Sequence, residues 1–204
     1  MEKEEEGKLE AILNAAQRMF GQYGLTKTTM TEIATEVGMG KASLYYYFPT
    51  KESLYEAVLV KEQGHFIQEI QKSIKPAASA ISILRLYSKK RMALFQNCVN
   101  LSKVSFENLV SAVPCVKRLV VDFGNKEVDV IQTVIELGIE NGEFEKVDAK
   151  EHAQFLVEIM TGLRIAAKKK RENMVFEKDD YTALSKNMSM AIEMFIGSFS
   201  VKTQ

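Results

Sequence analysis

The chain has 204 residues, with 27 basic side chains balanced by 27 acidic ones, and 46% of the residues are hydrophobic. This length fits one medium domain or a small domain joined to a larger one, and the hydrophobic content excludes a disordered chain. Two cysteines exclude a disulfide scaffold. Because the net charge is zero, it indicates neither nucleic acid nor membrane as a partner, and function must be sought in local pattern.

The N-terminal segment carries charged residues at positions 2–6 and lacks the apolar region of a signal peptide. No apolar stretch approaches the roughly 18 residues that a membrane span needs. We therefore expect a soluble cytoplasmic protein without a membrane partner.

Helical periodicity dominates the chain, and no convincing alternating strand pattern occurs. About nine helices are predicted, over residues 8–23, 29–37, 41–48, 51–74, 78–97, 102–112, 115–141, 149–171 and 180–200. The first three form a small head, residues 1–50. The remainder, residues 51–204, has the pattern of a helical bundle. The predicted fold class is all-α.

The two short helices near the N-terminus are joined by a three-residue turn that contains glycine, which matches a helix-turn-helix. Thr29 and Glu32 have the spacing of a capping box. Ala34 is small enough for the next helix to cross closely, and Gly38 allows the positive φ of a tight turn. Leu44 is expected to fill the space between the helices.

On a helical wheel, the third helix has two unlike sides. Leu44, Tyr47 and Phe48 cluster on one side and are predicted to be core. The other side carries Ala42, Tyr45 and Tyr46, with Lys41 and Ser43 at its edges. Exposed tyrosines are costly unless they are covered. DNA is a suitable cover, because tyrosine hydroxyls can bond phosphates and the rings can touch thymine methyl groups.

The segment Thr28–Leu54 closely resembles the DNA-binding domain of the tetracycline-repressor (TetR) family, most specifically in Leu44-Tyr45-Tyr46-Tyr47-Phe48 with Lys51. The resemblance covers about a quarter of the chain, roughly residues 8–60. It implies a homodimeric, ligand-responsive transcription factor. Such a factor has a helix-turn-helix DNA-binding domain followed by a helical ligand-binding and dimerisation domain.

The resemblance favours a repressor, because repressors are usual in the family. Such a repressor binds a palindromic operator in double-stranded DNA and is released by a small-molecule effector. Carried over by position, the implied DNA contacts are Thr28, Thr29, Lys41, Ala42, Ser43, Tyr45, Tyr46 and Lys51. Gly40, Ala42 and Tyr46 depart from residues that are frequent in the family, so the operator sequence does not follow from the resemblance.

The head is not strongly basic. Residues 1–61 hold seven basic and nine acidic side chains, and without the acidic segment 1–6 the counts are six and five. A DNA-binding domain is usually more basic. We therefore predict few phosphate contacts per head, a dependence on dimerisation, and a shallow dependence of DNA binding on salt.

The last two predicted helices carry more apolar surface than one small core explains. A two-fold bundle of two helices from each subunit would bury this surface. The predicted dimer interface consists of Leu156, Met160, Leu163, Leu184, Met188, Ala191 and Phe195. The alternative is that these side chains belong to the core of a single chain.

Ten methionines and several aromatic residues on the central helices suggest an adaptable apolar cavity for an effector. Its candidate lining is Phe66, Tyr87, Arg91, Phe95, Phe106 and Glu158. The alternative for each residue taken singly is ordinary core or surface.

An enzyme is not expected. Glu62-x-x-His65 is one of the two motifs that a di-iron bundle needs, but the chain has only two histidines and His152 does not complete a second motif. No phosphate loop or nucleophile motif is present. We therefore predict no metal and no cofactor. The remaining alternative function is a helical protein-interaction module without DNA binding.

Overall fold

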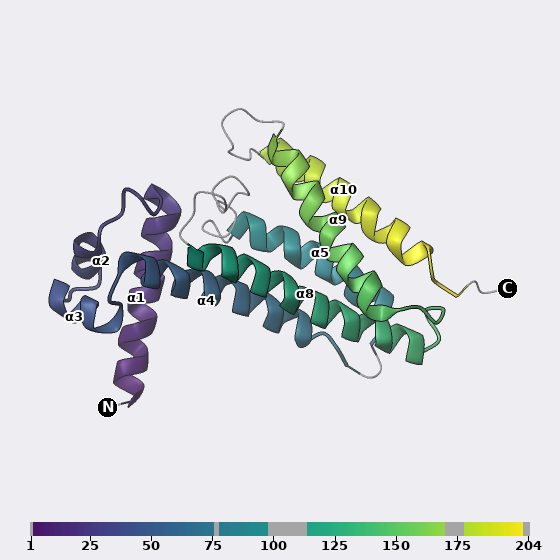
Figure 1. Ribbon diagram of the computed structural model, residues 1–204, viewed down its shortest axis with the longest axis horizontal. Coiled ribbons are helices and arrows are strands. Elements are labelled where there is room, and N and C mark those ends of the chain that lie inside the picture. Colours follow the sequence, from purple (N-terminus) through teal and green to yellow (C-terminus); the bar gives the residue numbers. More distant parts are fainter. Residues whose placement is uncertain (1, 76–77, 98–113, 170–177, 202–204) are drawn as a thin grey trace. The chain divides into compact units, whose positions relative to one another are not determined.

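The computed structural model describes residues 2–75, 78–97, 114–169 and 178–201, which contain eight helices (Figure 1). The helices are α1 (Glu2–Tyr23), α2 (Met30–Glu36), α3 (Lys41–Tyr47), α4 (Lys51–Gln71), α5 (Ala80–Asn97), α8 (Pro114–Glu140), α9 (Ala149–Lys169) and α10 (Lys178–Gly197). Within these ranges the extended pairing is a single bridge between Phe144 and Ser200. The all-α prediction is confirmed, and the helix predicted over residues 102–112 lies outside the described residues.

Local signals account for several helix ends. Gly24, Gly38 and Gly142 follow helices and have φ of 83°, 68° and 72°, where a side chain would be strained. The Thr50 hydroxyl accepts the Ser53 N–H at 3.0 Å before α4. Asp148 Oδ1 accepts the Glu151 N–H at 2.9 Å at the start of α9, as the spacing of these two residues predicts.

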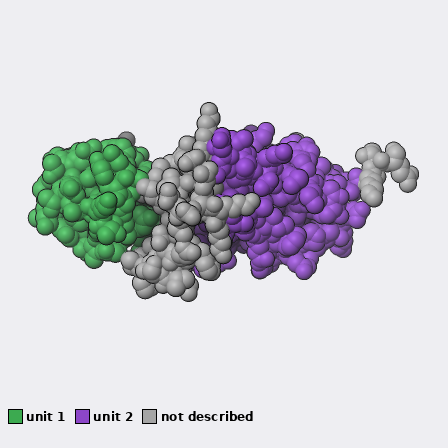
Figure 2. Space-filling view, turned by 90° about the horizontal axis from the view of Figure 1, so that it is seen from above, with its two compact units in different colours: residues 1–64, 97–119 green, residues 65–96, 120–204 purple. Residues whose placement is uncertain are grey.

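The chain divides into two compact units, coloured separately in Figure 2: unit 1 is Met1–Gly64 with Asn97–Leu119, and unit 2 is His65–Gln96 with Val120–Gln204. The division falls inside α4, at the last residue of α5 and inside α8, whereas the sequence pattern separates a head that ends at residue 50. The first turns of α4 pack in unit 1 because Leu54 and Val58 are fully buried and the Tyr55 ring meets Phe20 edge-on at 5.2 Å.

Unit 1 is a small helical core around α1–α3 and the start of α4. Ile12 and Phe20 from α1, Ile33 from α2 and Leu44 from α3 have at most 1% of their surface exposed. Each short helix is thus anchored by one large apolar side chain. Helices of seven residues are marginal in isolation, so α2 and α3 depend on this packing for stability.

Unit 2 is built from the end of α4, most of α5 and α8, and the whole of α9 and α10. Helix α9 packs along α10 (Figure 1). Its core is apolar, with fully buried side chains that include Ile70, Leu84, Ile131, Ile135, Leu156, Met160 and Met188. At Gly138 a Cβ would collide with the Phe144 ring and lie 2.9 Å from the Ala80 Cβ. No helix in the described part of the chain is long and apolar enough to cross a membrane.

Candidate functional site

The helix-turn-helix begins with a reciprocal cap at Thr29. Its hydroxyl oxygen accepts the Glu32 N–H at 3.2 Å, and Glu32 Oε2 accepts the Thr29 N–H at 2.9 Å and the Thr29 hydroxyl at 2.7 Å. These bonds hold the pKa of Glu32 below its ordinary value, because the Thr29 hydroxyl and N–H stabilise the carboxylate. The predicted capping box is therefore confirmed, and it fixes the start of α2.

The turn between α2 and α3 is set by small residues. Gly38 has φ of 68°, and the Met39 N–H reaches back to the Ala34 carbonyl at 2.9 Å. Ala34 is 2% exposed and Leu44 is fully buried, as predicted. Gly40 precedes α3 without a side-chain cap. The turn thus fixes which side of α3 faces the core.

The outward side of α3 carries the predicted recognition residues. Lys41, Ala42 and Ser43 are exposed. Tyr45 is 40% exposed and Tyr46 is 79% exposed. The Lys41 ammonium lies 5.8 Å from the centre of the Tyr45 ring, within the range of a cation–π contact.

Tyr47 was predicted to be core but is only half-buried. Its ring meets Tyr46 edge-on at 5.6 Å. Tyr47 ends the seven-residue α3, and Phe48, which follows it, occupies the buried position instead.

Two predicted DNA contacts are engaged within the protein. Thr28 is 1% exposed, and its hydroxyl donates to the Gly24 carbonyl at 2.9 Å, so its side chain has no free surface for DNA. The Lys51 ammonium donates to the Thr28 carbonyl at 3.1 Å and lies 3.5 Å from the Thr26 carbonyl. Lys51 therefore ties the start of α4 to the loop before α2. Because an ammonium has three donors, it can still reach a phosphate.

Most cations of unit 1 are likewise paired. Lys8 contacts Glu4 at 2.9 Å, Arg18 contacts Glu36 at 3.1 Å, and Lys61 contacts Glu10 at 3.7 Å. Among the described residues no ion pair joins the exposed Lys27 or Lys41. The positive charge that the head can offer to DNA is therefore smaller than its residue count suggests.

Three predicted pocket residues come together in the interior of unit 2. Phe66, Tyr87 and Arg91 are 3%, 1% and 3% exposed, and the rings of Phe66 and Tyr87 lie 6.0 Å apart. Tyr87 and Arg91 both donate to Glu127 of α8, at 2.9 Å and 2.7 Å. The side chain of Phe95 and all of Phe106 lie outside the described residues.

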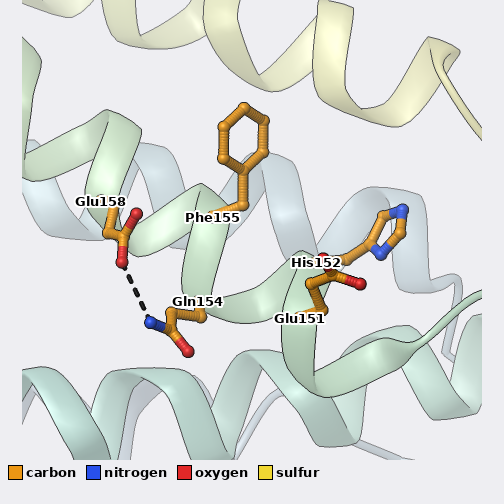
Figure 3. Close-up of a pocket in the computed structure, with 5 residues that line it drawn as sticks. All are labelled: Glu151, His152, Gln154, Phe155 and Glu158. Atoms are coloured by element: carbon orange, nitrogen blue, oxygen red, sulfur yellow. Dashed lines mark hydrogen bonds between the residues drawn. The ribbon is translucent and has the colours of Figure 1, made fainter.

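Glu158 lies elsewhere, on the outer side of α9. It lines an open groove together with Glu151, His152, Gln154 and Phe155 (Figure 3). Glu158 accepts a hydrogen bond from Gln154 at 3.1 Å, and Phe155 projects from the helix with 57% of its surface exposed. Glu158 is therefore not among the residues that surround Tyr87 and Arg91.

The residues predicted for the dimer interface lie mainly inside the protomer. Leu156, Met160, Leu184, Met188 and Phe195 are at most 6% exposed, whereas Leu163 and Ala191 are half-buried. The five buried side chains have no surface left for a second chain, because α9 and α10 already pack against each other and the rest of unit 2.

The sequence analysis assigned no role to the exposed apolar residues of α9 and α10 or to Glu127, the partner of Tyr87 and Arg91. Phe155, Met190 and Met194, 56–70% exposed, were visible as apolar positions off the main stripes. In the sequence, Glu127 stands out only as a single acidic residue among the apolar positions of α8. In the described ranges no group of three potential metal ligands occurs.

A comparison with known protein families matches the same part of the chain that forms the helix-turn-helix. Residues 12–58, which run from the middle of α1 to the first turns of α4, match the family model described as bacterial regulatory proteins of the tetR family. A transcriptional regulator from Cytophaga hutchinsonii, known from a crystal structure, is 42% identical, and the match covers 96% of this chain and all of that one with a TM-score of 0.86. The chain belongs to the TetR family.

Two further relatives are more distant. The fatty acid metabolism regulator protein of Bacillus subtilis is 23% identical over 144 residues, which cover 71% of this chain and 74% of that protein. SmeT of Stenotrophomonas maltophilia, the repressor of a multidrug efflux pump, is 19% identical with a TM-score of 0.70, covering 95% of this chain and 91% of that one. At this identity SmeT supports the fold alone.

This TetR-family chain is a DNA-binding transcriptional regulator, which confirms the predicted function and removes the interaction module as the alternative. The predicted partners (operator DNA, a second copy of the chain and a small-molecule effector) are those of the family.

Proposed function

We propose that this regulator is a homodimeric repressor that binds a palindromic operator through the outward face of α3 and leaves it when a small molecule binds in unit 2. The observation that carries the proposal is the contrast along α3, where Leu44 is fully buried and Tyr46 is 79% exposed. A helix that is anchored by one side and presents tyrosines on the other is suited to enter a major groove.

The contact set we propose is Thr29, Lys41, Ala42, Ser43, Tyr45, Tyr46 and Lys51. The exposed residues of α3 would meet base edges and sugars, while Thr29 and Lys51 would meet phosphates. Thr28 is left out because its hydroxyl is bonded inside the protein. In functional terms residues 1–50 would read DNA and residues 51–204 would bind effector and partner, with α4 shared between the two packing units.

For the dimer we propose the outer face of α9 and α10. Phe155 on α9 and Met190 and Met194 on α10 are 57%, 56% and 70% exposed, and Gly162 and Ala166 leave room for close helix approach. A second copy is the occupant that fits, because a two-fold axis brings the same apolar face to itself. Glu151 and Glu158 border this face and keep it from being uniformly apolar.

Repression and effector release rest on the family to which the chain belongs. SmeT is described as a repressor, and a complex of SmeT with triclosan has been solved. The function proposed here is binding without a catalysed reaction, carried out in the cytoplasm where the operator DNA lies. Effector binding can release DNA only if the effector prefers the DNA-free conformation.

The decisive experiment selects bound DNA from a random pool with the wild type, Tyr46→Ala and Tyr23→Ala in parallel. Tyr23 is a matched control because it is also an exposed tyrosine of unit 1, at 52%, but it ends α1. We expect the wild type and Tyr23→Ala to enrich the same inverted repeat, and Tyr46→Ala to enrich it weakly or not at all.

Equal enrichment by all three proteins would exclude the assignment of α3 as the recognition helix. Enrichment of a single half-site without symmetry would instead exclude the palindromic, dimeric mode of binding.

A further inference from the structure

Lys27 lies in the loop between α1 and α2, and the proposed contact set gives it no role. Its side chain is exposed, and among the described residues no ion pair joins its ammonium. By contrast, Lys8, Arg18 and Lys61 each contact a carboxylate of unit 1. The charge of Lys27 is therefore available to a partner outside the described part of the chain, as is that of Lys41.

The backbone around Lys27 is held from both sides. The Lys51 ammonium, at the start of α4, donates to the Thr28 carbonyl at 3.1 Å and lies 3.5 Å from the Thr26 carbonyl oxygen. The Thr28 N–H and the Thr28 hydroxyl both donate to the Gly24 carbonyl, at 3.2 Å and 2.9 Å. Because the residues before and after Lys27 are fixed, its side chain leaves the loop from a preorganised position, and binding does not have to order the backbone.

Lys27 shares a surface with Thr29, for which we propose a phosphate contact. Lys27 and Thr29 are exposed, whereas Thr28 between them is 1% exposed. Thr29 has the extended backbone angles φ −112° and ψ 151°. Alternate side chains of an extended segment leave it on the same side, and two residues span at most about 7 Å. Lys27 therefore lies beside Thr29, on the side of the loop that faces away from the core of unit 1.

We propose that Lys27 binds a phosphate of the operator next to the contact at Thr29, and that Lys51 is its positioning residue. This inference rests on the proposed binding of DNA by the helix-turn-helix and adds a contact to it. A lysine ammonium is a compact point charge on a flexible stem, so it suits a phosphate oxygen. Such a contact fixes the position of the head on the duplex and carries no information about base sequence.

Lys51 and Lys27 have different parts in this contact. An ammonium has three N–H donors, and two of those of Lys51 are directed to the carbonyls of Thr26 and Thr28. Removal of Lys51 releases the loop and with it the position of Lys27. The losses of affinity caused by substituting the two lysines should therefore not add, because both substitutions disable the same contact.

The test measures DNA binding by the full-length protein, by fluorescence anisotropy at about 50 to 200 mM salt. The two probes are the inverted repeat selected with the wild type and an unrelated duplex of the same length. The proteins are the wild type, Lys27→Gln, Lys51→Gln, the double variant and the control Lys89→Gln. Lys89 is an exposed lysine of α5, so its substitution changes the net charge equally at a site in unit 2.

We expect Lys27→Gln to make the slope of log K against log salt less negative by about 1.8, which is about 0.9 for each head of a dimer. It should weaken binding to the unrelated duplex as well, because both duplexes offer phosphates. Lys51→Gln should weaken binding by a larger factor in the wild type than in Lys27→Gln. Lys89→Gln should keep the wild-type slope.

The phosphate contact is overturned if Lys27→Gln keeps the wild-type slope, if Lys89→Gln flattens it equally, or if the loss of affinity is confined to the inverted repeat. The positioning role of Lys51 is overturned if its substitution costs the same factor with and without Lys27. Lys27→Arg keeps the charge, so a slope as flat as that of Lys27→Gln would also contradict the contact.

The proposed function fails by a different result, which is that the wild type enriches no inverted repeat. The slope measured on the unrelated duplex still tests the contact of Lys27 in that case.

Discussion

Replacing Lys41 by Gln should flatten the salt dependence of operator binding. Lys41 is the cation on the outward face of α3, it is exposed, and no ion pair joins it among the described residues. Its ammonium lies 5.8 Å from the Tyr45 ring, a contact that keeps the charge on this face. If this ammonium neutralises a phosphate, its loss removes the release of one counterion per head.

The size of the effect follows from the number of heads. The logarithm of the binding constant falls with the logarithm of salt concentration by about 0.9 for each phosphate that is neutralised. A dimer loses two such contacts, so the slope should become less negative by about 1.8. Between 50 and 200 mM salt, the wild type should therefore lose roughly tenfold more affinity than Lys41→Gln does.

The assay is fluorescence anisotropy with a labelled operator over this range of salt concentrations. Lys126→Gln is the matched control because Lys126 is an exposed lysine of unit 2, on α8. It changes the net charge equally and should leave the slope unchanged. Equal slopes for the wild type and Lys41→Gln would refute the phosphate contact. Equal flattening in both variants would attribute the effect to overall charge rather than to α3.

Three further outcomes follow from other contacts. Tyr46→Ala should weaken operator binding by about 1–3 kcal/mol. It should change the free energy of unfolding by less than about 0.5 kcal/mol, since Tyr46 is 79% exposed. Tyr46→Phe keeps the ring and removes the hydroxyl, so it distinguishes their contributions to operator binding. Leu44→Ala should cost about 2–5 kcal/mol of stability, measured by chemical denaturation, because Leu44 is fully buried; a loss below 1 kcal/mol would contradict this packing. Partial burial acts to raise the pKa of Glu143, but hydrogen bonds from Ser79 and the Ala80 N–H lower it overall. Glu143 therefore stabilises the fold above its ordinary pKa of 4.5, and this stabilisation is lost as pH falls through the lower folded-state pKa. Glu143→Gln should accordingly destabilise the protein at pH 7 and much less in acid, and a deficit that is constant with pH would contradict this.

The parts of the fold that could be predicted from the sequence are those set by neighbours along the chain. The Thr29–Glu32 cap spans three residues, and Gly38 needs only its own φ, so both are readable from spacing alone. Leu44 was assigned to the core because a seven-residue helix has one apolar side. The recognition face could then be predicted, because the residues on the side of α3 opposite Leu44 must face outward.

Tyr87 and Arg91 were predicted to lie near each other, but their shared partner Glu127 could not be predicted, because these contacts join residues that are far apart in sequence. Tyr87 and Glu127 are separated by 40 positions, and Arg91 and Thr161 by 70. Each is an unremarkable polar residue on an amphipathic helix until the helices pack. The dimer face could not be predicted for the same reason. Periodicity finds two apolar sides of α9, but it does not tell which of them packs against the rest of the protomer.

Ion pairs within unit 1 explain why the electrostatic attraction of each nearly neutral head to DNA should be weak. Lys8, Arg18 and Lys61 are paired with carboxylates of the same unit, and a cation in an ion pair adds little to the long-range attraction of phosphates. Bulk electrostatics thus contribute little per head, and non-specific binding should be weak. Two weak heads gain affinity when one dimer places both on adjacent half-sites, because binding of the first raises the effective concentration of the second. The proposed release of DNA by a ligand in unit 2 then needs only a change in the distance between the two heads, without any contact between ligand and DNA.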